Sequence, residues 1–532
     1  MKKLTVLFLA GILIFAFGTS GFAQAPKLEF RASGFIDTQT FLDVNVPQRN
    51  TTAGLYRTFG TNASYGFSGA PLFAPNNGLN HTASYWESRA HLKFDAIMGP
   101  NLSGTIFFEM DTQRYGAAWN SYPGNGREAN NFGAWTTDRA AVEIKNIYID
   151  VGLPYFGIPV PITVRVGAQP IGVRPHITVY SDGAGVTAGI KIDPVLIAPI
   201  YAKVLEANDF QDDDVDVWGL HASAKLGTFT VGGYGLYYRM NSYPLWVNQP
   251  TGIGGFPTAL TPAAPGSDKS HMWWLGAYVD GKAGPVDINF DFVYDFGSVE
   301  HGPNATRYLT QLPHVKYGGW ATRTKIDYPW EKFNFGVVGM YATGPDTRKT
   351  SDTGLPGSLT NTGVLSTKVS GYVVPPGSEQ DTSNNESIVI YGMDNGASGG
   401  IGIAKNSNYA ALCRGGFGGT WFAKLYSSIK ATPWYKLTLQ GLYVGDTTKH
   451  GNSLGNALRF PGTGSTLLRD DKDIGWELDL INEFQIYTNL RFTLGAGYLW
   501  AGDALDLRRG TSFTNFSPKN PWAVRTRLQY TF

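Results

Sequence analysis

The sequence predicts an all-β protein, specifically a transmembrane antiparallel up-and-down β-barrel of about eighteen strands. Three observations lead to this fold class: a two-residue alternation of apolar and polar side chains, connections that are alternately long and short, and an unusual composition. Successive side chains of a strand point to opposite faces, so alternation gives one face to lipid and one to water. The 66 glycines, 14% aromatic residues and 16% charged residues fit many tight turns and interfacial aromatic bands.

The two ends of the chain agree with this prediction. Segment 522–532 alternates large apolar side chains with a face that carries two arginines. At the start, Lys2 and Lys3 precede an apolar run at 4–17 and then small residues up to Ala23. This layout is typical of a secretory signal peptide, and the run is too short for a spanning helix. We therefore expect a signal peptide at 1–23 and a single transmembrane β-barrel domain at 24–532.

The alternation is clearest in two segments. In 86–96, apolar side chains alternate with five ionisable residues, and in 286–296 every second residue is aliphatic or aromatic while the others are mostly acidic or amide. The phase slips near Asn146, which suggests a bulge. The expected strands are 28–46, 86–96, 102–111, 142–151, 162–169, 186–192, 200–204, 218–226, 229–237, 273–279, 286–296, 320–326, 333–341, 421–431, 437–443, 474–486, 490–500 and 522–532.

The connections between these strands support an even strand number. Odd-to-even connections are long, as at 47–83 or 344–419, whereas even-to-odd connections are mostly short, as at 99–101 or 193–194. Long extracellular loops and short periplasmic turns are the expected asymmetry of an outer-membrane barrel. A count of sixteen strands stays open if 142–151 and 200–204 are misassigned.

Composition and motifs exclude several functions. The 43 basic and 42 acidic residues leave no excess charge for binding nucleic acid. Cys413 is the single cysteine and cannot form an internal disulfide. His221 and Ser223 share a strand face, but no third group that would orient the histidine is evident. The sequence has none of the common nucleophile, phosphate, zinc or haem motifs, so we expect no enzyme, cofactor or metal site. The acidic stretch 208–216 is expected to be a solvated loop rather than a calcium site.

Several stretches resemble porins of Gram-negative bacteria, particularly the trimeric-porin-like family of deltaproteobacteria. They are 89–111, 164–169, 341–344 and 475–504, and they sample much of the chain. The resemblance implies location in the cell outer membrane, a homotrimer, and passive diffusion of small hydrophilic solutes and ions through a water-filled channel. It also implies contact with outer-membrane lipid and lipopolysaccharide. The aromatic-ended last strand resembles the signal that the barrel-assembly machinery recognises.

The connection 170–184 is the candidate constriction loop. Its isoleucine and valine content is high for a solvated loop, which predicts that it packs inward, and in porins the third loop narrows the channel. The candidate constriction residues are Arg165, Gln169, Arg174, His176, Tyr180 and Asp182. The candidate pore-wall residues, chosen by their position on the polar face, are Arg89, Lys93, Glu109, Asp111, Asp287, Asp291, Arg323, Lys325, Arg491, Arg525 and Arg527.

Other functions stay open from the sequence. A substrate-selective channel, for a sugar or a small anion, would be favoured by a continuous stripe of inward aromatic rings such as Tyr201, Tyr234, Tyr238, Phe422 and Tyr426. A structural or adhesive barrel would use the long extracellular loop 344–419 as its binding part. A sheath around a separate cytochrome would need an interior without a constricting loop.

Overall fold

The computed structural model describes residues 27–45, 82–115, 142–153, 160–206, 212–241, 268–301, 314–344, 346, 368–375, 386–391, 418–453, 455, 457–462, 467–509 and 514–532. The predicted signal peptide lies outside these residues. The elements are β1 (Leu28–Val44), β2 (Thr82–Met98), β3 (Leu102–Arg114), β4 (Glu143–Gly152), β5 (Ile162–Val173), β6 (Val179–Ile192), β7 (Val195–Leu205), β8 (Val215–Leu226), β9 (Phe229–Met240), β10 (Asp268–Ala283), β11 (Val286–His301), β12 (His314–Trp330), β13 (Phe333–Ala342), β14 (Lys368–Val369), β15 (Thr420–Thr432), β16 (Tyr435–Asp446), β17 (Asp473–Tyr487), β18 (Leu490–Ala501), η4 (Asp503–Leu505), β19 (Leu507–Arg509), β20 (Thr514–Phe516) and β21 (Trp522–Thr531).

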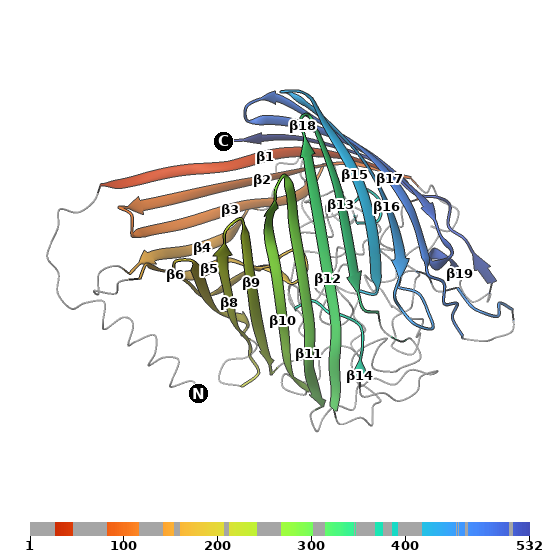
Figure 1. Ribbon diagram of the computed structural model, residues 1–532, viewed down its shortest axis with the longest axis horizontal. Coiled ribbons are helices and arrows are strands. Elements are labelled where there is room, and N and C mark those ends of the chain that lie inside the picture. Colours follow the sequence, from red (N-terminus) through yellow and green to blue (C-terminus); the bar gives the residue numbers. More distant parts are fainter. Residues whose placement is uncertain are drawn as a thin grey trace.

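Eighteen of these strands form one antiparallel sheet that closes on itself. Each long strand pairs with the next in chain order, and β21 returns to pair with β1 (Figure 1). Gly34 and Phe532 complete the closure, since the N–H of each donates to the carbonyl of the other, at 2.9 and 3.0 Å. The predicted fold class and strand number are therefore confirmed. The predicted strand 142–151 corresponds to β4, which begins one residue later, and 200–204 lies within β7, so the sixteen-strand alternative is wrong.

The bulge expected near Asn146 is present between β3 and β4. Phe107 is opposite Asn146 whereas Phe108 is opposite Ile144, which leaves Lys145 as the extra residue. The predicted constriction loop is wrong in its boundaries. Segment 170–184 is mostly strand, because β5 continues to Val173 and β6 begins at Val179, so only 174–178 is the turn.

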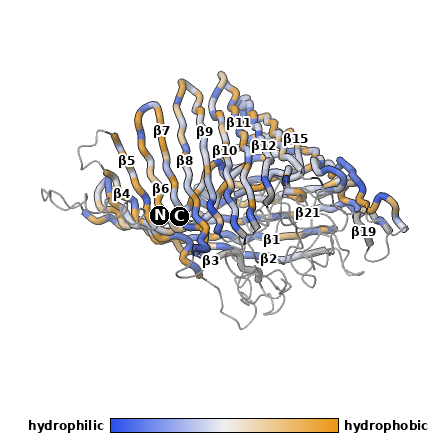
Figure 2. Tube along the Cα trace, turned by 90° about the horizontal axis from the view of Figure 1, so that it is seen from below, coloured by the Kyte–Doolittle hydropathy of each residue, from blue (hydrophilic) through white to orange (hydrophobic). Residues whose placement is uncertain are grey.

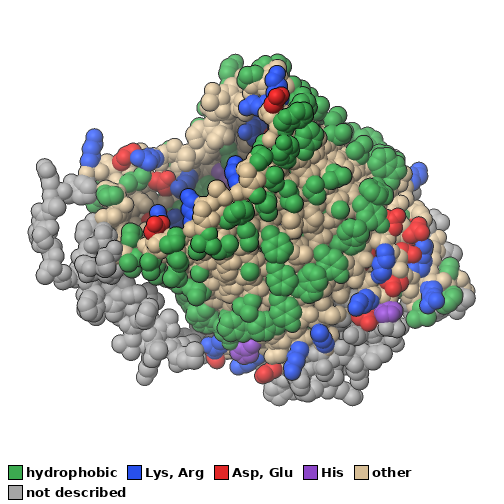
Figure 3. Space-filling view, viewed as in Figure 1, with side chains coloured by type: hydrophobic (Ala, Val, Ile, Leu, Met, Phe, Trp, Pro, Cys, Tyr) green, Lys and Arg blue, Asp and Glu red, His purple; other side chains and the backbone are tan. Residues whose placement is uncertain are grey.

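The two faces of the barrel wall differ as the alternation predicts. Apolar side chains are exposed on the outer face, where Figure 3 shows them spread over the wall while charged side chains gather at its edges. Apolar and polar residues alternate along the strands in Figure 2. Outward rings stack across strands, as in Trp218, Tyr237 and Trp273. Tyr201 is the register partner of Trp218 and shares this outer face, so its predicted inward orientation is wrong.

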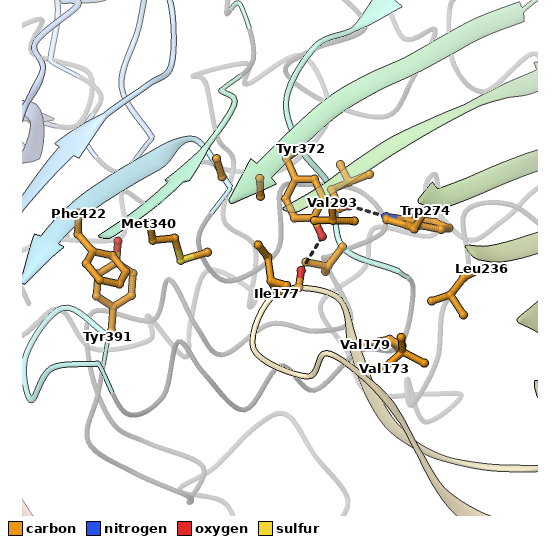
Figure 4. Close-up of a cluster of buried hydrophobic side chains, with 14 of the residues drawn as sticks. Val173, Ile177, Val179, Leu236, Trp274, Val293, Met340, Tyr372, Tyr391 and Phe422 are labelled. Carbon is orange, nitrogen blue, oxygen red and sulfur yellow. Dashed lines mark hydrogen bonds between the residues drawn. The ribbon is translucent and has the colours of Figure 1, made fainter. Parts of the chain in front are cut away.

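Hydrophobic side chains are also buried inside the barrel. They include Ile177 from the β5–β6 turn, Tyr372 from the segment after β14, and Tyr391, all with 0% exposure. Figure 4 shows Ile177 beside Tyr372, and Tyr391 beside Phe422 and Met340. The barrel interior is therefore occupied by segments of the chain that leave the wall. No helix among the described residues is long and apolar enough to cross a membrane.

Candidate functional site in the barrel interior

The β5–β6 hairpin leaves the barrel wall partway along its length. Its two strands pair with each other up to Val173 and Val179. Pairing with the neighbouring strands stops earlier, at Ala168 on the β4 side and at Ala184 on the β7 side. Residues 169–183, which we call the inner hairpin, are thus free of the wall ladder. Their apolar side chains are buried inside the barrel, which explains the isoleucine and valine content of this stretch.

The tip of the inner hairpin is tied by charge to another part of the wall. Arg174 donates to Asp280 of β10 (2.6 Å from Nη1 to Oδ2) and to Asp291 of β11 (2.8 Å from Nη2 to Oδ2). Asp291 is 1% exposed, so this carboxylate is almost fully covered. A guanidinium that meets two carboxylates, one of them buried, makes strong and directional hydrogen bonds. The hairpin tip is therefore held against β10 and β11.

Neutral hydrogen bonds hold the same tip from other sides. The Tyr372 hydroxyl donates to the Ile177 carbonyl at 2.6 Å, and the Thr178 and Tyr234 hydroxyls are hydrogen-bonded. Tyr372 belongs to segment 368–375, which is anchored in turn by a bond from Trp274 Nε1 to the Val373 carbonyl at 2.8 Å (Figure 4). The Val373 N–H donates to Asp295 of the wall at 2.8 Å. The hairpin tip and this segment therefore pack on each other inside the barrel.

A second part of the long connection lines another sector of the wall. In residues 386–391, which we call the inner segment, the Ser387 hydroxyl and the Ile390 N–H both donate to Glu477 Oε2 at 2.9 Å. Glu386 is paired with Arg323 of β12 at 2.7 Å and with Lys424 of β15. Burial acts to raise the pKa of Glu386, but Lys424 and Arg323 outweigh it and lower the pKa to about 2. This carboxylate is therefore ionised at neutral pH.

Acidification should loosen the inner segment only at low pH. Because the pKa of Glu386 falls from 4.5 to about 2 on folding, its ion pairs stabilise docking fully above pH 4.5. That contribution is lost as the pH falls from 4.5 toward 2. Hydrogen exchange of the amides in 386–391, followed by mass spectrometry, should accelerate across this window. Glu386→Gln is the control and should not show this acceleration of exchange between pH 4.5 and 2. Acceleration between pH 7 and 5 would contradict the role of the Glu386 carboxylate in docking.

The six predicted constriction residues separate into two groups. Arg174 and His176 lie in the hairpin turn, and Tyr180 lies on β6 opposite Gly172. The His176 side chain is exposed, but partial desolvation of its ring and the nearby Arg323 act to lower its pKa.

The other three lie near the base of the hairpin and contact neighbouring wall groups. Asp182 accepts from Asn146 at 2.8 Å and pairs with Lys145 at 3.0 Å. Gln169 donates to the Gly185 carbonyl at 2.9 Å, and Arg165 pairs with Asp150 at 2.7 Å. The structure thus places only part of the predicted set at the hairpin tip.

The predicted pore-wall residues mostly form ion pairs within the polar face. Glu109 accepts from Arg89 Nε at 2.9 Å and from Lys145 at 2.8 Å. Asp111 lies in β3, but its side chain is outside the described residues. The remaining pairs are Lys93–Asp95, Lys282–Asp287, Arg174–Asp291, Arg323–Glu386, Lys325–Asp327, Arg491–Glu483, Arg525–Asp43 and Arg527–Asp37.

Two residues at the centre of this arrangement were missed by sequence reasoning. Asp280 continues the inward parity of Tyr278 on β10, so a longer strand assignment would have found it. Glu386 follows no alternating pattern, and its partner Arg323 is 63 positions away. No local signal in the sequence marks it.

A cavity of about 280 Å³ lies between the inner hairpin and the wall strands β4 to β8. Its polar lining includes Asp150, Arg165, Thr187 and His221, and its apolar lining comes from residues such as Ile171. The cavity therefore offers charges of both signs together with apolar surface. A small solute of mixed polarity would match this lining.

These features define the class of the protein. A closed, even-numbered antiparallel barrel with an apolar outer face and a charged inner face is the architecture of outer-membrane β-barrels. The charged inner face is suited to contact with water and the apolar outer face to contact with lipid, while the closed sheet pairs its backbone groups. The chain is an outer-membrane β-barrel protein.

Comparison with known proteins gives similarities of structure. No protein-family model and no curated protein sequence matches the chain. Similar solved structures come from Pseudomonas aeruginosa. OccK11 (OpdR) is 10% identical with a TM-score of 0.44, covering 94% of this chain and 96% of that one. OccK9 (OpdG) is 10% identical with a TM-score of 0.48, covering 95% and 98%. The outer membrane protein OpdK is 9% identical with a TM-score of 0.44, covering 94% and 99%.

Proposed function

We propose that the protein is an outer-membrane channel that admits small hydrophilic solutes and selects among them at a constriction built by the inner hairpin. The observation that carries this proposal is the position of Arg174, which leaves the β5–β6 wall with the hairpin and pairs with Asp280 and Asp291. A barrel of this width is not filled by its own wall side chains, so the segments inside it determine what can pass.

The charges inside the barrel favour selection of solutes by their shape and by the local electric field, rather than by the net charge of the channel. Arg174 is opposed by two carboxylates, whereas Glu386 is opposed by two cations. An acidic excess therefore lies near β10 and β11, and a basic excess near β12 and β15. Such opposed groups orient a dipolar solute within a narrow passage. Arg174, His176 and Tyr180 are the proposed constriction residues, and Arg165, Gln169 and Asp182 the proposed base of the hairpin.

The inward aromatic rings do not form an open stripe. Tyr234, Tyr238 and Phe422 are 6%, 3% and 2% exposed, and Thr178 of the inner hairpin and Tyr391 of the inner segment contact Tyr234 and Phe422, respectively. Tyr426 is partly buried, and its hydroxyl donates to Asp327. We therefore place selectivity at the hairpin and not along an aromatic track. An inner hairpin that contacts the wall strands β9 to β11 also leaves less space for an enclosed cytochrome. The homotrimer and the contact with lipopolysaccharide are further parts of the proposal, to be tested by cross-linking in native membranes.

Single-channel recording in planar bilayers, with reversal potential under a salt gradient, tests the proposal. Wild-type protein should give discrete conductance steps. Liposome swelling with neutral sugars, amino acids and vanillate, the compound present in one OpdK structure, should show unequal rates at equal solute size. Absence of steps from a correctly folded, heat-modifiable barrel would refute the channel. Rates that depend on solute size alone would refute the selectivity.

A further inference from the structure

We propose that Tyr278, which lies flat against Gly232 of the barrel wall, positions Arg174 and thereby sets the selectivity of the constriction. This inference rests on the proposed channel function and assigns a role to two residues that need not touch the solute. Tyr278 is on β10 and Gly232 is its register partner on β9. Both lie on the inner face, beneath the hairpin tip.

The guanidinium of Arg174 stacks on the Tyr278 ring. Its Cζ lies 4.1 Å from the ring centroid, within the range of a cation–π interaction. The hydroxyl of Tyr278 is 2.8 Å from Nε2 of His221 on β8, so the ring is also fixed at its far end. Tyr278 is 6% exposed. Asp280 and Asp291 attract the arginine, while the ring fixes the plane in which its guanidinium lies.

Gly232 is the reason that the ring can lie flat. A Cβ atom built at Gly232 would be 2.4 Å from both Cε1 and Cζ of Tyr278, which is closer than real Cβ contacts occur. Any other residue at 232 would therefore displace the ring. A second pair repeats the arrangement beside it, since a Cβ at Gly276 would be 2.1 Å from Cζ of Tyr234. The Tyr234 hydroxyl is hydrogen-bonded to Thr178 of the same hairpin tip.

Gly232→Ala tests the inference, with Gly233→Ala as the matched control. The two positions are adjacent on β9, but a Cβ at Gly233 would meet only the Gly276 carbonyl oxygen, at 3.4 Å. Gly232→Ala should shift the reversal potential toward cation preference, in the same direction as Arg174→Ala, and Gly233→Ala should not. Tyr278→Leu should match Gly232→Ala, while Tyr278→Phe, which keeps the ring, should lie between it and the wild type. Heat-modifiable migration confirms that each variant folds.

A double substitution separates positioning from a general structural effect. If Gly232 acts through Arg174, adding Gly232→Ala to Arg174→Ala should change selectivity no further. An additional shift in the double variant would overturn the inference. So would equal shifts from Gly232→Ala and Gly233→Ala.

A readout without current distinguishes failure of the inference from failure of the proposed function. In a Cys413→Ala background, the variant Ile177→Cys reports the accessibility of the hairpin tip to a soluble thiol reagent, because the Ile177 side chain is 0% exposed while the tip is docked. Gly232→Ala should raise the labelling rate by about fivefold or more, as loss of a buried cation–π contact implies, and Gly233→Ala should leave it unchanged. Labelling that does not respond to Gly232→Ala would overturn the inference even if the wild type conducts. A normal response in a protein that gives no conductance steps would refute only the channel.

Discussion

Replacement of Arg174 by alanine is expected to raise single-channel conductance and to shift selectivity toward cations. The substitution removes the guanidinium that joins the hairpin tip to Asp280 and Asp291, and Asp291 is buried. Loss of one partner of a buried ion pair costs about 3–5 kcal/mol in the docked state, where the other charge would remain buried without compensation. The tip should therefore undock. Two carboxylates would then face the passage without their cation, and each attracts a nearby permeating cation by on the order of 1 kcal/mol.

The measurement is conductance together with reversal potential under a salt gradient. Arg491→Ala is the matched control, since it also removes one positive charge from the inner face. The Arg491 side chain is 55% exposed and lies 3.9 Å from Glu483 at the short-turn end of β18, away from the inner hairpin and from residues 386–391. A several-fold rise in the cation-to-anion permeability ratio is expected for Arg174→Ala only. Equal shifts in the two variants would mean that the charge acts through the overall field and not through the constriction.

Replacement of Glu386 by glutamine is expected to shift selectivity in the opposite direction. The substitution keeps the size of the side chain but removes the negative charge that pairs with Arg323 and Lys424. These two cations are 7% and 6% exposed, so without Glu386 no carboxylate charge would offset the cost of removing them from water. The inner segment should loosen, and the two positive charges should raise the permeability of anions several-fold.

Reversal potential measures this shift, and hydrogen exchange of residues 386–391 measures the loosening. Glu483→Gln is the control, because Glu483 pairs with the half-exposed Lys436 at 2.6 Å near the short-turn end of the barrel. That pair is solvent-exposed and is expected to contribute about 1 kcal/mol or less. A cation shift from Glu386→Gln, or an unchanged exchange rate, would show that the inner segment is not held by this carboxylate.

The barrel could be predicted from the sequence because the pattern that specifies each strand lies within that strand. Apolar and polar residues alternate within each strand, as in β11, and this pattern needs no knowledge of distant residues. The same periodicity predicted a bulge near Asn146 from one slip in phase, and the structure shows that Lys145 is the extra residue. The periodicity also assigned the inner face of charged wall residues such as Arg323 and Asp291. Because the outer face of the wall meets lipid and the inner face meets water, apolar and polar side chains alternate along each strand. This alternation identifies the strands and the face on which each side chain lies.

The arrangement of the interior was decided by tertiary structure. The apolar content of 170–184 indicated an inward path, but alternation could not show that β5 and β6 continue into the hairpin after leaving the wall. Arg174 meets Asp280 and Asp291 across 106 and 117 positions, and Glu386 meets Arg323 across 63. The two-residue alternation of polarity indicates only the face of the wall on which a side chain lies. The pairing of charges across the lumen depends on how the sheet closes and on how far each inner segment extends into the barrel. No single stretch of the sequence determines either of these features.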